Sequence, residues 1–155
     1  MKLNAEVRGG NKLEKKLRQY MDRLTSKRRV LVGIPEGAGK YEDGTPLAVI
    51  GVVQELGSAD GLIPERSFLR VPLRQNKENI SRAFRALTGK VARGEITLIQ
   101  MLDQIGARAA GYCIEAIENG IAPPNADSTI KAKGSSTPLV DLGRMKGSIT
   151  HVVED

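Results

Sequence analysis

The feature that most constrains this fold is a long helical pattern over residues 95–118. Its apolar residues recur every three or four positions and so form one stripe: Leu98, Leu102, Ile105, Ala109, Cys113 and Ile117. Asn119 and Gly120 then end the helix. At about 1.5 Å per residue, a helix of this length extends for roughly 35 Å. It therefore spans about the width of a single domain.

Three shorter segments show the alternating pattern of β-strands, at residues 2–7, 28–34 and 148–153. A small antiparallel sheet built from these strands, packed with several helices, predicts an α+β domain. Besides the long helix, helical patterns cover residues 12–24, 69–87 and 142–146. Gly89 and Gly94 are predicted to bracket a turn before the long helix.

Residues 47–56 are almost wholly apolar, so periodicity alone does not separate a buried strand from a buried helix. Thr45 is a capping residue type, and Pro46 suits the first position of a helix. The polar residues Gln54 and Glu55 end the apolar run. We therefore interpret this segment as a helix.

The composition suits one domain over residues 1–155, with extended loops at 36–45, 57–65 and 120–138. Apolar residues make up 40% of the chain and aromatic residues only 3%, so Leu, Ile, Val and Ala must build the core. No apolar run reaches the roughly 18 residues that a membrane-spanning helix needs. The first residues also lack the apolar core of a signal peptide. We expect a soluble protein that is made in a cytosol and has no membrane partner.

The net charge of +6 is unevenly distributed along the chain. Residues 1–30 carry ten Lys/Arg and three Asp/Glu, whereas residues 31–155 carry fourteen and fifteen. Within the second part, residues 66–93 hold eight basic residues and one acidic residue, Glu78. Such segments are typical of solvated helix faces, but they can also attract nucleic acid or an acidic partner surface.

No motif predicts catalysis, a cofactor or a metal site. The segment from Gly37 to Lys40 resembles the end of a phosphate-binding loop, but Ile34 and Tyr41 occupy the positions of its first Gly and its Ser or Thr. The single histidine, His151, has no serine nucleophile motif and no ligand cluster to accompany it. Cys113 lies on the apolar stripe of the long helix and is expected to be a small buried hydrophobe. We therefore do not expect an enzyme.

Three segments together resemble a known family. The first is Glu42-Asp43-Gly44-Thr45-Pro46, with an apolar element that ends in Gln54-Glu55-Leu56-Gly57. The second is Ile63-Pro64-Glu65-Arg66-Ser67-Phe68-Leu69-Arg70, and the third covers residues 119–149. In this order they resemble the minor-tail, tail-completion and head–tail joining proteins of tailed phages, the broad group that includes the minor tail protein Z of phage lambda. Leu142 departs from the pattern, because the family commonly has Asp-Thr-Gly where this chain has Asp141-Leu142-Gly143.

The resemblance implies a structural virion protein at the neck or tail, present in the host cytoplasm during assembly. It implies a homo-oligomeric ring, most plausibly of six subunits, that contacts neighbouring neck and tail-tube proteins and could contact genomic DNA in the channel. The subunit contacts are expected at Arg66, Arg70, Arg74, Pro123, Pro124, Asn125, Lys131 and Lys133. The alternative is a basic nucleic-acid-binding protein that contacts duplex DNA.

Overall fold

The computed structural model describes residues 10–25, 27–123 and 143–154 of the chain. A sheet of two antiparallel strands joins distant parts of the sequence: β1 (Arg29–Gly33) pairs with β2 (Thr150–Glu154). The register places Val32 opposite His151. The strands predicted at 28–34 and 148–153 are therefore present, while the strand predicted at 2–7 lies outside the described residues.

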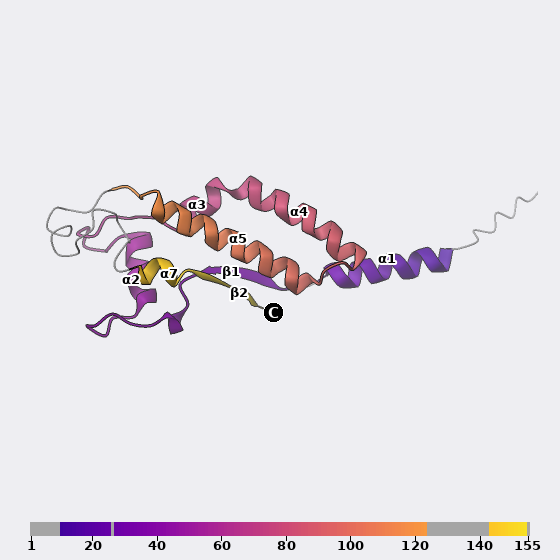
Figure 1. The fold of residues 1–155 in the computed structure, drawn as a ribbon, viewed down its shortest axis with the longest axis horizontal. Helices are drawn as coiled ribbons and strands as arrows, with labels where there is room; N and C mark the ends of the chain where they lie inside the picture. The colour runs from indigo at the N-terminus through magenta and orange to yellow at the C-terminus, as the bar shows by residue number, and fades with distance from the viewer. Residues whose placement is uncertain (1–9, 26, 124–142, 155) are drawn as a thin grey trace, which may run out of the picture.

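Helices cover one side of this sheet. The long helix α5 (Leu98–Glu118) packs against both strands, and α4 (Lys77–Arg93) packs against α5 (Figure 1). This arrangement confirms the predicted α+β class. No helix among the described ranges is both long and apolar enough to cross a bilayer.

A capping box fixes the start of α5 at Leu98. The Thr97 hydroxyl accepts a hydrogen bond from the backbone N–H of Gln100 at 3.1 Å, and the Gln100 side chain accepts one from the N–H of Thr97 at 2.8 Å. The predicted stripe of this helix is buried from Leu102 to Ile117. The helix contributes to two core clusters. Cys113 and Ile117 pack with Phe68 and Met145, two residues that the stripe patterns did not single out, while Met101 and Leu102 pack with Val91.

The helix predicted at residues 69–87 is two helices. It divides at Asn76 into α3 (Arg70–Gln75) and α4, and the Asn76 side chain donates a hydrogen bond to the carbonyl of Pro72 at 3.1 Å. The turn predicted between Gly89 and Gly94 is also wrong at its first end, because α4 continues through Gly89 to Arg93. Burial of Val91 within the last turns of α4 offsets the cost of a helical glycine. Gly94 adopts the left-handed conformation, with φ at 76°, that ends α4.

The segment at 47–56 is a helix, as predicted. It is α2 (Leu47–Leu56), and it begins one residue later than the sequence suggested, because Pro46 is its N-cap. The Thr45 side chain does not cap it; instead the backbone N–H of Thr45 donates to the Asp43 carboxylate at 2.9 Å. Two short elements complete the fold: the 3-10 turn η1 (Glu36–Ala38) and α7 (Arg144–Gly147), which includes part of the predicted 142–146 helix.

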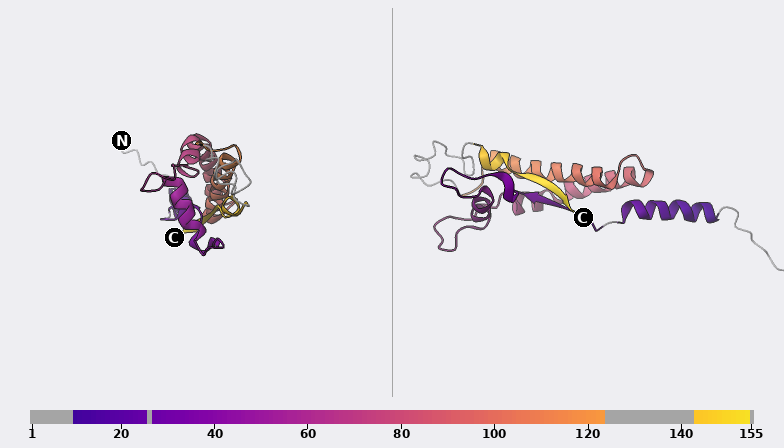
Figure 2. Two further views of the ribbon diagram at one scale, coloured as in Figure 1. Left: turned by 90° about the vertical axis from the view of Figure 1, so that its left-hand side faces the viewer. Right: turned by 90° about the horizontal axis from the view of Figure 1, so that it is seen from below.

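The molecule is elongated and its two ends differ. Helix α1 (Gly10–Leu24) extends away from the body at one end, and its last residue, Leu24, packs against the Val91 and Met101 cluster. Helix α2 lies at the opposite end, together with α7 and the loops on either side of α2 (Figures 1 and 2). The chain therefore presents two unlike surfaces far apart from one another.

Candidate functional site

A buried carboxylate organises the end of the molecule that carries α2. Glu55 lies in the last turn of α2 and is only 7% exposed. Its carboxylate accepts hydrogen bonds from the Ser67 hydroxyl at 2.7 Å, from the backbone N–H of Leu69 at 2.9 Å and from that of Arg70 at 3.1 Å. This carboxylate therefore holds both the loop after α2 and the start of α3 in place.

Arg70 provides the opposite charge. Its Nε donates to the Glu55 carboxylate at 2.9 Å, while its Nη2 donates to Glu65 at 2.7 Å and to the Glu55 carbonyl at 3.2 Å. Burial by itself would raise the pKa of Glu55, but hydrogen bonds from Ser67, Leu69 and Arg70 outweigh it and hold this pKa below its ordinary value. The hydrogen bond to Glu55 raises the pKa of Arg70. Both groups are therefore charged at neutral pH.

A second arginine connects this cluster to the exit of α5. Arg66 is 6% exposed, and its backbone N–H donates to the carbonyl of Gln54 at 2.7 Å. Its guanidinium donates to the Gln54 side chain at 3.2 Å and to the carbonyl of Pro123 at 2.9 Å. Arg66 therefore joins the ends of α2 and α5 to the loop between α2 and α3. We call Glu55, Arg66, Ser67 and Arg70 the Glu55 hub.

Gly57 makes the close approach of these segments possible. It has φ at 79°, and a Cβ there would lie 3.1 Å from both the backbone nitrogen of Glu65 and the carbonyl oxygen of Ile63. A side chain would therefore be strained and would collide with backbone. The loop closes just beyond it, where the N–H of Ser58 donates to the carbonyl of Ile63 at 2.9 Å.

The structure gives the expected contact residues different surroundings. Arg66 is buried within the chain, and the side chain of Arg70 is about half exposed while paired with Glu55 and Glu65. Arg74 is exposed on α3, and Pro123 is exposed with its carbonyl bound by Arg66. The remaining four, Pro124, Asn125, Lys131 and Lys133, lie outside the described residues.

The sequence pattern places Glu55 at the end of the apolar 47–56 segment but does not by itself predict that its carboxylate is buried. The available signal was an acidic residue at the end of an apolar helix, followed at a distance of twelve to fifteen residues by Ser67 and Arg70. A buried carboxylate needs several donors, and this spacing supplies a hydroxyl, a guanidinium and the free N–H groups of a helix start.

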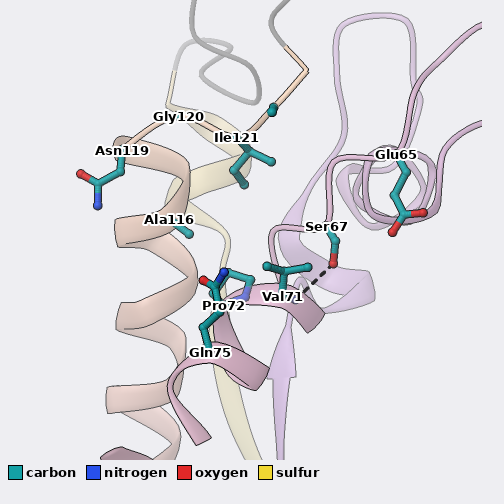
Figure 3. A pocket seen from close by; sticks show the side chains of 10 residues that line it. Glu65, Ser67, Val71, Pro72, Gln75, Ala116, Asn119, Gly120 and Ile121 are labelled. Atoms are coloured by element: carbon teal, nitrogen blue, oxygen red, sulfur yellow. Dashed lines mark hydrogen bonds between the residues drawn. The ribbon is translucent and has the colours of Figure 1, made fainter.

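A hollow of about 680 Å³ lies beside the hub, between α3 and the end of α5 (Figure 3). Its walls are Glu65, Ser67, Val71, Pro72, Gln75, Ala116, Asn119, Gly120, Ile121 and Ala122. The Ser67 hydroxyl accepts a hydrogen bond from the N–H of Val71 at 3.2 Å and donates to Glu55, so this serine is held in place by the fold. The walls of the hollow combine polar and apolar side chains.

The single cysteine and the single histidine of the chain both lie in or against α5. Cys113 is fully buried in the core, and burial together with the charge of Glu55 raises the pKa of its thiol to about 11. His151 Nε2 lies 2.9 Å from Oδ1 of Asp103, and its ring packs directly over Gly106 of α5. Within the described part of the chain, no three His, Cys, Asp or Glu residues gather as a metal site would require.

A basic groove runs between α4 and α5. Arg82 and Arg108 are both exposed along it, and Asn79, Gln104 and Tyr112 complete its polar lining around a volume of about 550 Å³. Among the described residues, neither arginine forms a salt bridge with a carboxylate. This groove is therefore a second surface able to bind an anionic partner such as a phosphate backbone.

Comparisons of the chain with protein-family models, with curated proteins and with solved structures found no match.

Proposed function

We propose that this chain is a structural virion protein of a tailed bacteriophage, which acts at the neck in tail completion or head–tail joining as a ring, with six copies as the expected number. The observation that carries the proposal is the Glu55 hub. The third family-like segment is far from the other two in the sequence, yet parts of all three are hydrogen-bonded together here, through Glu55 to Ser67 and Arg70 and through Arg66 to Pro123.

The hub supports a structural role because its side chains bind groups of their own chain. The Glu55 carboxylate pairs with Arg70 and accepts hydrogen bonds from Ser67 and two backbone N–H groups, and the Arg66 guanidinium donates to Gln54 and to the carbonyl of Pro123. A hydrogen-bonded network of this kind makes the loops at this end of the molecule rigid. We also propose that residues 2–7 form a third strand, which adds to the β1–β2 sheet.

The morphology of phage particles that are assembled without this protein tests the proposed function. Electron microscopy is expected to show full heads beside finished but unattached tails if the chain joins the head to the tail. Unfinished or overlong tails would instead assign it to tail termination. Normal infectious particles, or a virion reconstruction in which neck and tail lack this chain, would refute the proposal.

A nucleic-acid-binding function is the second candidate, and the basic groove between α4 and α5 favours it. Arg82 and Arg108 could contact phosphates there, as they could in a ring that surrounds DNA. Retention of bare duplex DNA at physiological ionic strength would support this function over a purely structural one.

A further inference from the structure

Helix α1 exposes an apolar face that the other described residues leave open to solvent. Leu17 and Met21 are 59% and 58% exposed, and Tyr20 is exposed beside them. Their spacing of three and four residues places them on one side of the helix. Lys12, Lys15 and Lys16 are exposed around this face, and Glu14 is paired with Arg18. The exposed part of α1 is therefore an apolar stripe with a basic border.

Helix α2 exposes a stripe of similar size at the other end of the molecule. Its inner side packs through Leu47 and Gly51, whereas Val49, Val52 and Leu56 are each at least half exposed. Positions i, i+3 and i+7 lie on one face of a helix. These three side chains therefore form one exposed apolar stripe, of the kind that can serve as a contact surface.

The segments that flank α2 carry the opposite charge to α1. Exposed Glu36, Glu42, Asp43 and Asp60 lie before and after α2, against one exposed lysine, Lys40. The charge of Glu65 is balanced by its ion pair with Arg70. Helix α1 carries five basic and two acidic residues. Both stripes are therefore apolar, and the residues around them carry opposite charges.

We infer that the exposed face of α1 binds the exposed face of α2 on a second copy of this chain. One molecule cannot make the contact with itself, since α1 and α2 lie at opposite ends (Figures 1 and 2). The two patches differ, so the contact is heterologous, and such contacts build rings when the rotation between copies closes. The inference rests on the proposed function, because a ring needs two unlike surfaces on each copy.

Cross-linking of purified full-length chains tests this contact directly and traps it even when it is weak. Met21→Cys and Val52→Cys place one reactive thiol in each stripe, and a short bismaleimide reagent tolerates small differences in register. The native Cys113 is fully buried and does not compete. We expect a mixture of the two variants to give at least about tenfold more cross-linked dimer than either variant alone, since only the mixture places unlike patches together.

Two controls make the result specific. Ile99→Cys, at an equally exposed apolar position on α5, should not cross-link to Val52→Cys. Adding Leu17→Glu to the Met21→Cys chain should reduce the cross-linked dimer about tenfold, because it would bury a charge in the contact. Circular dichroism of each variant checks that the fold is intact.

Each remaining outcome overturns the inference. Equal cross-linking of Met21→Cys chains with one another would show a symmetric α1 pairing instead. Absence of any cross-link, with loss of duplex DNA retention in Leu17→Glu/Met21→Glu, would assign the α1 face to nucleic acid. Because purified protein suffices, failure here is separable from failure of the phage role, which particle morphology decides.

Discussion

Glu55 shows how one side chain can determine the geometry of a whole end of this molecule. Replacing it with Gln removes the negative charge and turns one acceptor into a donor that faces the N–H of Leu69. We expect Glu55→Gln to lower the free energy of unfolding by about 2 kcal/mol, less than for a fully buried ion pair because Arg70 can still be hydrated. Urea denaturation measures this loss. Glu115→Gln, on the exposed side of α5, should change it by less than about 0.5 kcal/mol.

The same residue predicts a pH dependence. The pKa of Glu55 is lower in the folded chain than its ordinary value, so its stabilisation is present at neutral pH and above about pH 4.3. It is lost as the pH falls below that value and through the folded-state pKa. The difference in unfolding free energy between wild type and Glu55→Gln should therefore shrink on acidification. A difference that stays constant from neutral pH to about pH 3 would contradict this account.

Within α5, two glycines are predicted to respond in opposite ways to the same substitution. A Cβ at Gly106 would lie 2.3 Å from the His151 ring, whereas nothing lies within 4 Å of a Cβ at Gly111. Gly106→Ala should destabilise the fold by about 2 kcal/mol, because β2 must move away from α5. Gly111→Ala should stabilise it by about 0.5–1 kcal/mol, since alanine is the better helix former. Thermal melts compare the two, and a Gly106→Ala protein as stable as wild type would disprove the packing argument.

At the scale of elements, sequence periodicity and capping residues predicted helices whose position depends on nearby residues. The stripe of α5 and its end at Asn119 follow from periodicity and capping residues. The helical state of α2 follows from Pro46 at its start, although the Thr45 side chain does not cap it. At the break, the Asn76 side chain makes a local hydrogen bond to the carbonyl of Pro72 that the periodicity does not reveal. The continuation of α4 through Gly89 depends on tertiary packing of Val91, which overrides the low helix propensity of glycine. The same holds for the site: the sequence marked the segments around Glu55 and Arg70, but only the folded chain shows that they bind one another.

The arrangement of charge over the whole molecule determines its expected behaviour toward DNA. The positive charge of α1 is separated from the acidic surroundings of α2, and the α4–α5 groove offers only two arginines. Each phosphate contact contributes about 0.9 to the slope of log affinity against log salt, so two contacts give weak binding. We therefore expect the purified chain to retain duplex DNA at low salt and to release it at physiological ionic strength.

The double variant Arg82→Ala/Arg108→Ala removes both arginines of the groove and so measures their contribution to DNA binding. It should reduce the salt slope by about two without affecting the cross-link between α1 and α2, because the groove belongs to neither stripe. Lys40→Ala/Arg144→Ala removes the same charge from exposed positions outside the groove and should leave the slope nearly unchanged. Tight retention at physiological salt that both double variants weaken equally would mean that DNA binds through the overall charge. In that case the nucleic-acid function would be favoured over the structural one, because two arginines in one groove do not account for such affinity.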